Sequence, residues 1–275
     1  MGVIPEAETD QQRNKRRYQR TLFDGIAELY QAYRPGYPKL VVDFVVSTAA
    51  LDVDSTALEV GCGTGQLTER LARFGFSLRA IDVGPSMIAS ARRRLENNAV
   101  SLQVASFEDF AADEASFDLI ISGAAFHWID PEIRFSKSAR LLRPGGLLAL
   151  LDIEDRYDDA IGSVLDRMWS ARGDTRGAWA KPIPDAEVIV STGLFGQPVH
   201  WTHAQRIVLP ANVVIGLENT RATSLSWPDD IRHEFTEELR HHLRSEPEVQ
   251  LTRRTSVMMT PAKAHANLGC SLPRC

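Results

Sequence analysis

The stretch Ala57-Leu58-Glu59-Val60-Gly61-Cys62-Gly63-Thr64-Gly65-Gln66 decides the fold that we predict for this 275-residue chain. A short apolar run ends in three glycines at alternate positions, and Leu67, Leu71 and Phe74 then recur at helical spacing. The stretch therefore predicts a strand, a tight glycine turn and a helix. Glycine suits such a turn because it tolerates positive φ and leaves room for a ligand against the backbone. The helix N-terminus offers free N–H groups to that ligand.

The charges around this turn argue against a dinucleotide ligand. The spacing G-x-G-x-G differs from the dinucleotide fingerprint G-x-G-x-x-G, and Glu59 would repel a pyrophosphate. A second acid, Asp82, ends the next apolar run at the place where doubly wound folds bind ribose hydroxyls. We therefore expect a nucleoside with a cationic extension, a description that S-adenosylmethionine (SAM) fits.

Four segments in register resemble the motifs of class I SAM-dependent methyltransferases. They are 59–65, 80–82, 117–122 and 141–146, and the resemblance covers about residues 20–152. The segment 23–38 resembles the N-terminal lid of small-molecule methyltransferases related to the trans-aconitate and quinone-biosynthesis enzymes. The resemblance implies SAM as methyl donor and S-adenosylhomocysteine (SAH) as product.

The predicted fold class is α/β, with a doubly wound, mostly parallel seven-stranded sheet, helices on both faces and an inserted cap. Strands and helices alternate five times up to Asp152, which is typical of a parallel sheet covered on both faces. We expect residues 1–20 to be a flexible segment, with a flap over the active site as the functional alternative. Residues 21–260 would form the methyltransferase domain with a cap at about 153–225, and residues 261–275 a tail.

Composition limits the partners. The net charge of −5 argues against an extended phosphate-binding face, so we expect no nucleic-acid partner. No apolar run approaches the roughly 18 residues of a membrane span, and the polar N-terminus lacks a secretory signal. We therefore expect a cytoplasmic monomer or homodimer. Cys62, Cys270 and Cys275 form neither a disulfide framework nor a metal motif, and we expect no metal.

The expected cofactor site lies at the carboxyl ends of the strands, as in other open α/β sheets. Arg34 could pair with the methionyl carboxylate, because a guanidinium matches a carboxylate fork, or it could form a surface ion pair. Ser106 stands where the family usually carries an Asp that contacts adenine. The expected cofactor-binding residues are Tyr30, Arg34, Glu59, Gly61, Cys62, Gly63, Gly65, Gln66, Asp82, Val83, Met87, Ser106, Phe107, Glu108 and Ser122.

The methyl acceptor should approach beside the loop that follows the fourth strand. There His127 could act as a general base, or it could hydrogen-bond the cofactor or the loop. The expected acceptor contacts are Tyr37, Trp128, Tyr157 and Trp169. We expect methyl transfer to a small organic acceptor, with oxygen favoured over nitrogen or carbon. The alternatives are a SAM-binding protein of this fold that does not methylate, and an RNA or protein methyltransferase.

Overall fold

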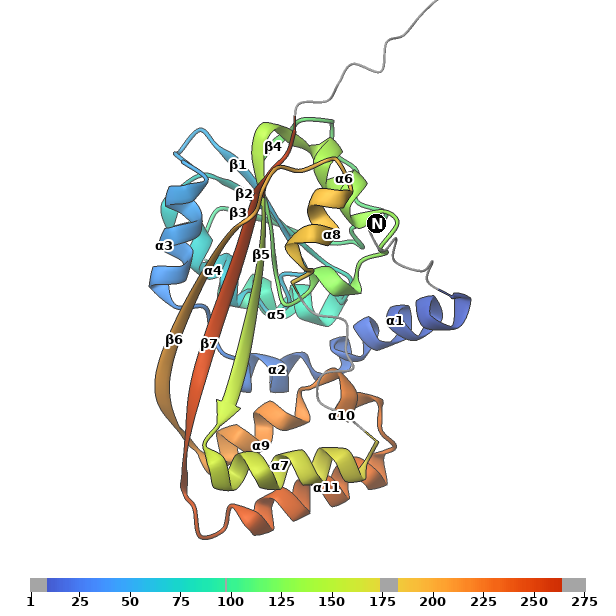
Figure 1. Ribbon diagram of the computed structural model, residues 1–275, viewed down its shortest axis with the longest axis vertical. Coiled ribbons are helices and arrows are strands. Elements are labelled where there is room, and N and C mark those ends of the chain that lie inside the picture. The colour runs from blue at the N-terminus through green and yellow to red at the C-terminus, as the bar shows by residue number, and fades with distance from the viewer. Residues whose placement is uncertain (1–8, 97, 174–182, 264–275) are drawn as a thin grey trace, which may run out of the picture.

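The computed structural model describes residues 9–96, 98–173 and 183–263. Within these residues, seven strands form one sheet in the order β3-β2-β1-β4-β5-β7-β6 (Figure 1). Neighbouring strands from β3 to β5 are parallel, whereas β7 runs antiparallel to both β5 and β6. The prediction of a mostly parallel seven-stranded sheet is therefore confirmed, with β7 as the antiparallel exception.

The strands are β1 (Thr56–Val60), β2 (Ser77–Asp82), β3 (Val100–Val104), β4 (Phe117–Gly123), β5 (Leu142–Tyr157), β6 (Val199–Pro210) and β7 (Glu248–Pro261). The helices are α1 (Asp10–Leu22), α2 (Ala27–Tyr33), α3 (Lys39–Thr48), α4 (Gln66–Leu71), α5 (Pro85–Arg94), α6 (Arg134–Leu141), α7 (Asp159–Ala171), α8 (Ala186–Ser191), α9 (Ala211–Asn219), α10 (Ala222–Ser226) and α11 (Asp229–His242). Short 3-10 turns are η1 (Asp24–Ile26), η2 (Ala72–Phe74) and η3 (Phe126–Trp128).

Helices cover both faces of the sheet, as predicted, and each face has its own hydrophobic cluster. On one face, Val41 and Val45 of α3 pack with Leu71 of α4 against the strands. On the other face, Phe135 of α6 and Ile189 of α8 complete the second cluster. Buried on both faces, β4 is apolar along nearly its whole length, as a central parallel strand should be.

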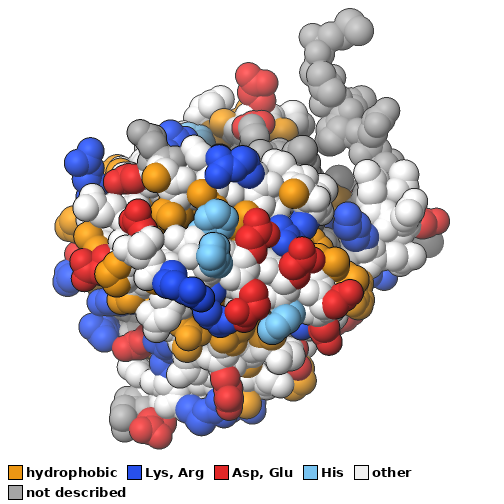
Figure 2. All heavy atoms as spheres, turned by 90° about the horizontal axis from the view of Figure 1, so that it is seen from below, with side chains coloured by type: hydrophobic (Ala, Val, Ile, Leu, Met, Phe, Trp, Pro, Cys, Tyr) orange, Lys and Arg blue, Asp and Glu red, His pale blue; other side chains and the backbone are white. Residues whose placement is uncertain are grey.

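A helical layer lies at one end of the sheet, where β5, β6 and β7 extend beyond the other strands (Figure 1). Helices α7, α9 and α11 pack there around the buried side chains of Trp169, Val214 and Phe235. The expected cap at 153–225 differs from this layer in two ways: β6 belongs to the sheet, and α11 lies outside the range. The outer face of the layer mixes acidic, basic and hydrophobic side chains (Figure 2).

The expectation of a flexible segment at 1–20 is wrong for residues 10–20, which belong to helix α1. The helix begins with a capping box, in which Thr9 and Gln12 satisfy each other's backbone N–H groups. Arg16 and Gln19 are buried against the rest of the protein. In the described part of the chain, none of the helices has the length and apolarity of a membrane span.

Candidate active site

The glycine turn after β1 has the backbone conformation that the sequence predicts. Gly61, Gly63 and Gly65 have φ values of +74°, +56° and +87°. A Cβ at Gly61 would lie 2.3 Å from the Cβ of Ala125, in the loop after β4. Glycine is therefore required at Gly61, because any side chain would push the two loops apart.

Asp82, the last residue of β2, holds this turn in place. One carboxylate oxygen of Asp82 accepts a hydrogen bond from the N–H of Gly63 at 2.9 Å. The other accepts one from the N–H of Gly84, also at 2.9 Å. Burial raises the pKa of Asp82, and these backbone hydrogen bonds oppose the shift. Each oxygen keeps a lone pair that a ligand hydroxyl could use.

A cavity opens beside Asp82 at the carboxyl ends of β1, β2 and β4. Half of the residues that line the cavity are ones that the sequence predicts for the site: Tyr30, Gly61, Gly63, Asp82, Val83, Met87, Phe107, Glu108 and Trp128. The other lining residues are Arg20, Phe23, Val60, Ile81, Ala105, Gly123, Ala124, Ala125 and Ile129. The cavity therefore joins a few charged side chains, Asp82, Glu108 and Arg20, to largely apolar walls, which is typical of small-molecule sites.

Helix α1 covers one side of this cavity. The guanidinium of Arg20 lies 2.8 Å from the Glu108 carboxylate, and both side chains are largely buried. Arg16 donates a hydrogen bond to the backbone oxygen of Trp128 at 2.8 Å. Sequence reasoning missed Arg20 because residues 1–20 were expected to be flexible. The capping box Thr9-x-x-Gln12 is the signal that could have placed a helix there.

Three predicted cofactor residues have structural roles beside the cavity and do not line it. Cys62 packs with Ala80 and Ile88 in a small core cluster. The hydroxyl of Ser122 donates to the backbone oxygen of Val60 at 2.9 Å. The hydroxyl of Ser106 accepts a hydrogen bond from the N–H of Asp109 and stabilises the turn after β3.

Gly65 and Gln66 form the junction between the glycine turn and α4. A Cβ at Gly65 would lie 3.4 Å from Ala91, so glycine lets this turn approach α5 closely. The Gln66 side chain is buried and accepts a hydrogen bond from the hydroxyl of Thr64. Neither residue lines the cavity, and both support the turn that does.

Glu59 lies inside the protein at the end of β1. Its side chain is only 2% exposed, and one carboxyl oxygen has no hydrogen-bond partner among the described residues. Burial raises the pKa of Glu59 to about 8. The carboxyl therefore holds a proton at neutral pH, and a cation bound nearby would favour its ionisation.

His127 lies in η3, with its ring 4.5 Å from the ring of Trp128. Burial and then the charge of Arg134 lower the pKa of His127 to about 4. The imidazole is therefore neutral at pH 7. Its Nδ1 atom is buried and has no partner in the part of the chain that the structure describes. Trp128 lines the cavity, whereas His127 is not among the lining residues.

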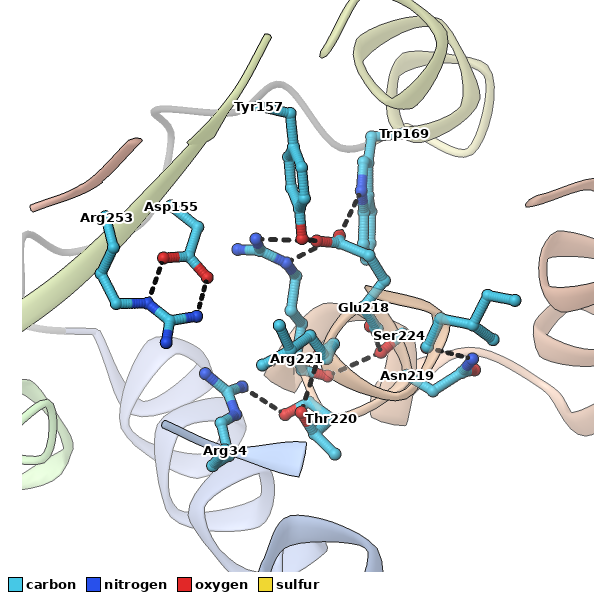
Figure 3. A network of polar contacts seen from close by, with 12 residues as sticks. Arg34, Asp155, Tyr157, Trp169, Glu218, Asn219, Thr220, Arg221, Ser224 and Arg253 are labelled. Atoms are coloured by element: carbon cyan, nitrogen blue, oxygen red, sulfur yellow. Dashed lines mark hydrogen bonds and ion pairs between the residues drawn. The ribbon is translucent and has the colours of Figure 1, made fainter. Parts of the chain in front are cut away.

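Tyr37 and Arg34 do not line the cavity, but each lies against a residue that does, Gly123 and Tyr30 respectively. A Cβ at Gly123 would lie 2.3 Å from the Tyr37 hydroxyl, so this hydroxyl rests against the wall of the cavity. The Arg34 guanidinium donates a hydrogen bond to the backbone oxygen of Thr220 (Figure 3). Arg34 thus reaches toward the helical layer, and it is not among the residues that line the cavity.

The two remaining predicted acceptor contacts, Tyr157 and Trp169, lie in the core of the helical layer. The Tyr157 hydroxyl and the Trp169 indole N–H both donate hydrogen bonds to the carboxylate of Glu218 (Figure 3). Arg221 completes this buried group with two hydrogen bonds to the same carboxylate. Neither aromatic residue lines the cavity.

Residues 58–150 match the model of a family described as a methyltransferase domain. The chain is 29% identical over 227 residues to an uncharacterised methyltransferase of Mycobacterium tuberculosis, covering 82% of this chain and 86% of that protein. It is 34% identical over 183 residues to a ubiquinone biosynthesis O-methyltransferase of Xanthomonas oryzae, covering 65% and 66%. A solved structure described as a candidate type II methyltransferase of Anaeromyxobacter dehalogenans matches with a TM-score of 0.58 at 25% identity, covering 84% and 98%.

Proposed function

We propose that this chain, a class I SAM-dependent methyltransferase, transfers the methyl group of SAM to a small organic acceptor, with oxygen as the favoured acceptor atom. The single observation that carries the proposal is the position of Asp82, fixed by two backbone N–H groups at the edge of a largely apolar cavity. The similarity to an O-methyltransferase of ubiquinone biosynthesis supports the preference for oxygen.

The residues around the cavity fit SAM. The free lone pairs of Asp82 suit the two ribose hydroxyls. Val83, Met87 and Phe107 offer an apolar slot for adenine. The partnerless oxygen of Glu59 suits the cationic end of the ligand.

The demands on the protein are modest in such a reaction. Bound SAM supplies an electrophilic methyl group on a sulfonium. The chain must hold the acceptor in line with it and exclude water, and positioning of this kind can lower a barrier by roughly 7–11 kcal/mol. We assign Tyr30, Trp128 and the α1 helix to the walls that exclude water.

We assign His127 to binding and not to proton transfer. Its imidazole is neutral and its Nδ1 has no partner among the described residues, but His127 is not one of the residues that line the cavity. A hydrogen bond to the loop or to the methionine end of SAM suits this position. Similarly, we retain Arg34 as a candidate for the methionyl carboxylate, which would require its guanidinium to turn from Thr220.

The test is SAH formation from SAM. The purified protein is first titrated with SAM by calorimetry and then incubated with a panel of phenols, hydroxy acids, carboxylic acids and amines. We expect micromolar binding of SAM and SAH release with at least one hydroxyl or carboxyl acceptor. Binding without SAH release from any acceptor would favour the non-methylating alternative. Release only with RNA or protein would favour the macromolecular one.

A further inference from the structure

Asp152 is an acidic residue of β5 at the point where this strand extends beyond its pairing with β4. It follows Leu151, the residue of β5 that pairs with Gly123 of β4 in the cavity wall. The N–H of Ala124, also in the wall, donates to the backbone oxygen of Leu151 at 2.7 Å. Asp152 is therefore one residue from the segment of β5 that supports the cavity, on the side away from β2 and β3.

This side is where the methyl acceptor must approach. The ribose and adenine contacts that we propose lie over β2 and β3, at Asp82, Val83 and Phe107. The opposite end of the ligand then lies over β1 and β4. An acceptor that attacks the methyl group in line must come from beyond it, in the direction of β5.

The Asp152 carboxyl is available for a ligand. It is partly exposed, and no side chain of the described residues forms a hydrogen bond or ion pair with it. Asp155, further along the same strand, differs, because Arg253 binds it through two hydrogen bonds of 2.6 and 2.7 Å (Figure 3). An acid without a structural partner beside a cavity is a candidate functional group.

The charged groups around Asp152 come from four segments. Glu154 lies two residues along β5, and Arg34 and Arg221 approach from the end of α2 and the start of α10. The Tyr37 hydroxyl lies against Gly123 on the same side of the cavity. On β7, the register partner of Asp152 is the uncharged Ser256. Burial and the charge of Glu154 raise the pKa of Asp152, while the Ile153 amide and the two guanidiniums oppose them.

We propose that Asp152 is the proton acceptor of the methyl-transfer site. As the acceptor oxygen or nitrogen forms its bond to the methyl carbon, the carbon–sulfur bond breaks and its electron pair stays on sulfur. The proton of the attacking hydroxyl or amine passes to the Asp152 carboxylate. The products are SAH, the methylated acceptor and a protonated Asp152, which returns its proton to water. The inference rests on the proposed function. It adds a proton acceptor, which the proposed function does not assign.

The test compares Asp152→Asn with Glu154→Gln, a matched removal of an acid two residues away. Both are assayed with an acceptor that the wild type methylates. We expect Asp152→Asn to lower kcat at least about 100-fold, to change the SAM dissociation constant less than threefold, and to remove the acidic limb of the pH–rate profile. Glu154→Gln should keep the limb, and Asp152→Glu should restore part of kcat.

Three results would overturn the proposal. They are a wild-type kcat in Asp152→Asn, an unchanged acidic limb, or a loss of SAM affinity that matches the loss of activity. A second measurement needs no acceptor: carboxyl 13C NMR of the SAH-loaded protein, with Asp152→Asn to assign the resonance. A pKa of the Asp152 carboxyl above the ordinary range of aspartate supports the proposal, and a pKa within that range contradicts it. A failure of the proposed function would appear in the wild type, as absent SAM binding or absent SAH release.

Discussion

Arg20 on α1 and Glu108 in the loop after β3 form a largely buried ion pair at 2.8 Å, and both side chains line the proposed cofactor cavity. The pair joins the N-terminal helix α1 to the methyltransferase domain at the wall of the cavity. Removing one partner of such a pair leaves the other charge buried without a counter-ion. The protein then loses more stability than when a surface ion pair is removed.

The first prediction concerns this pair. Glu108→Gln should speed SAH dissociation at least about tenfold, because α1 loses its shortest ion pair with the domain, the one that lines the cavity. Stopped-flow displacement of a fluorescent SAH analogue measures the rate. Glu132→Gln is the control, since Glu132 is exposed and lies 3.8 Å from Arg13. Equal rates in the two variants would show that α1 does not limit ligand release.

The second prediction concerns Asp82. Asp82→Ala removes both the proposed ribose contact and the acceptor for the Gly63 and Gly84 N–H groups. We expect SAM affinity to fall at least about 100-fold, which corresponds to roughly 2.7 kcal/mol. Calorimetry measures the affinity, and circular dichroism checks that the variant is folded. Wild-type affinity in a folded variant would remove Asp82 from the site.

The third prediction separates two glycines of the turn. Gly61→Ala should destabilise the fold, because the new Cβ would lie 2.3 Å from Ala125. Gly63→Val also strains a backbone with a φ of +56°, but its Cβ would lie no closer than 3.7 Å to a described side chain, that of Tyr30, so we expect a smaller loss of stability together with a loss of SAM binding. Thermal unfolding and SAM titration distinguish the two. The assignment of Gly63 to the ligand surface fails if the valine variant binds SAM normally.

The fourth prediction is a pH dependence of stability that comes from Glu59. The folded state keeps this proton until about pH 8, whereas the unfolded chain releases it near the ordinary value of 4.5. The contribution of Glu59 to the free energy of unfolding is therefore fully present below pH 4.5, and it is lost as the pH rises toward 8. Glu59→Gln should not suffer this loss and should gain stability over the wild type, by up to about 3 kcal/mol near pH 7.

Urea unfolding at pH 5, 6.5 and 8 measures the effect of Glu59→Gln. The control is Glu69→Gln, a half-buried acid that pairs with Arg73 and Arg94 on the surface. A difference between Glu59→Gln and wild type that stays constant across this range would show that Glu59 is already ionised in the folded protein.

Short sequence patterns predict the part of the site that is built from residues close together in the chain. The glycine turn, Asp82 and the apolar slot follow from a strand, a turn and the next strand end, all within about 50 residues. Tyr157 and Trp169 were misplaced because an aromatic residue after β5 suits a pocket wall and a core equally well. Their position depends on Glu218, which lies 61 residues after Tyr157 and 49 residues after Trp169, and no local pattern links the three.

The position of β7 has a consequence for how the chain folds during synthesis. The last strand of the described residues, β7, lies between β5 and β6 and pairs with both along most of its length. Until residues 248–261 leave the ribosome, the edges of β5 and β6 are unpaired, and a growing chain would expose two open strand edges. The sheet therefore becomes continuous from β3 to β6 only when residues 248–261 are available for pairing.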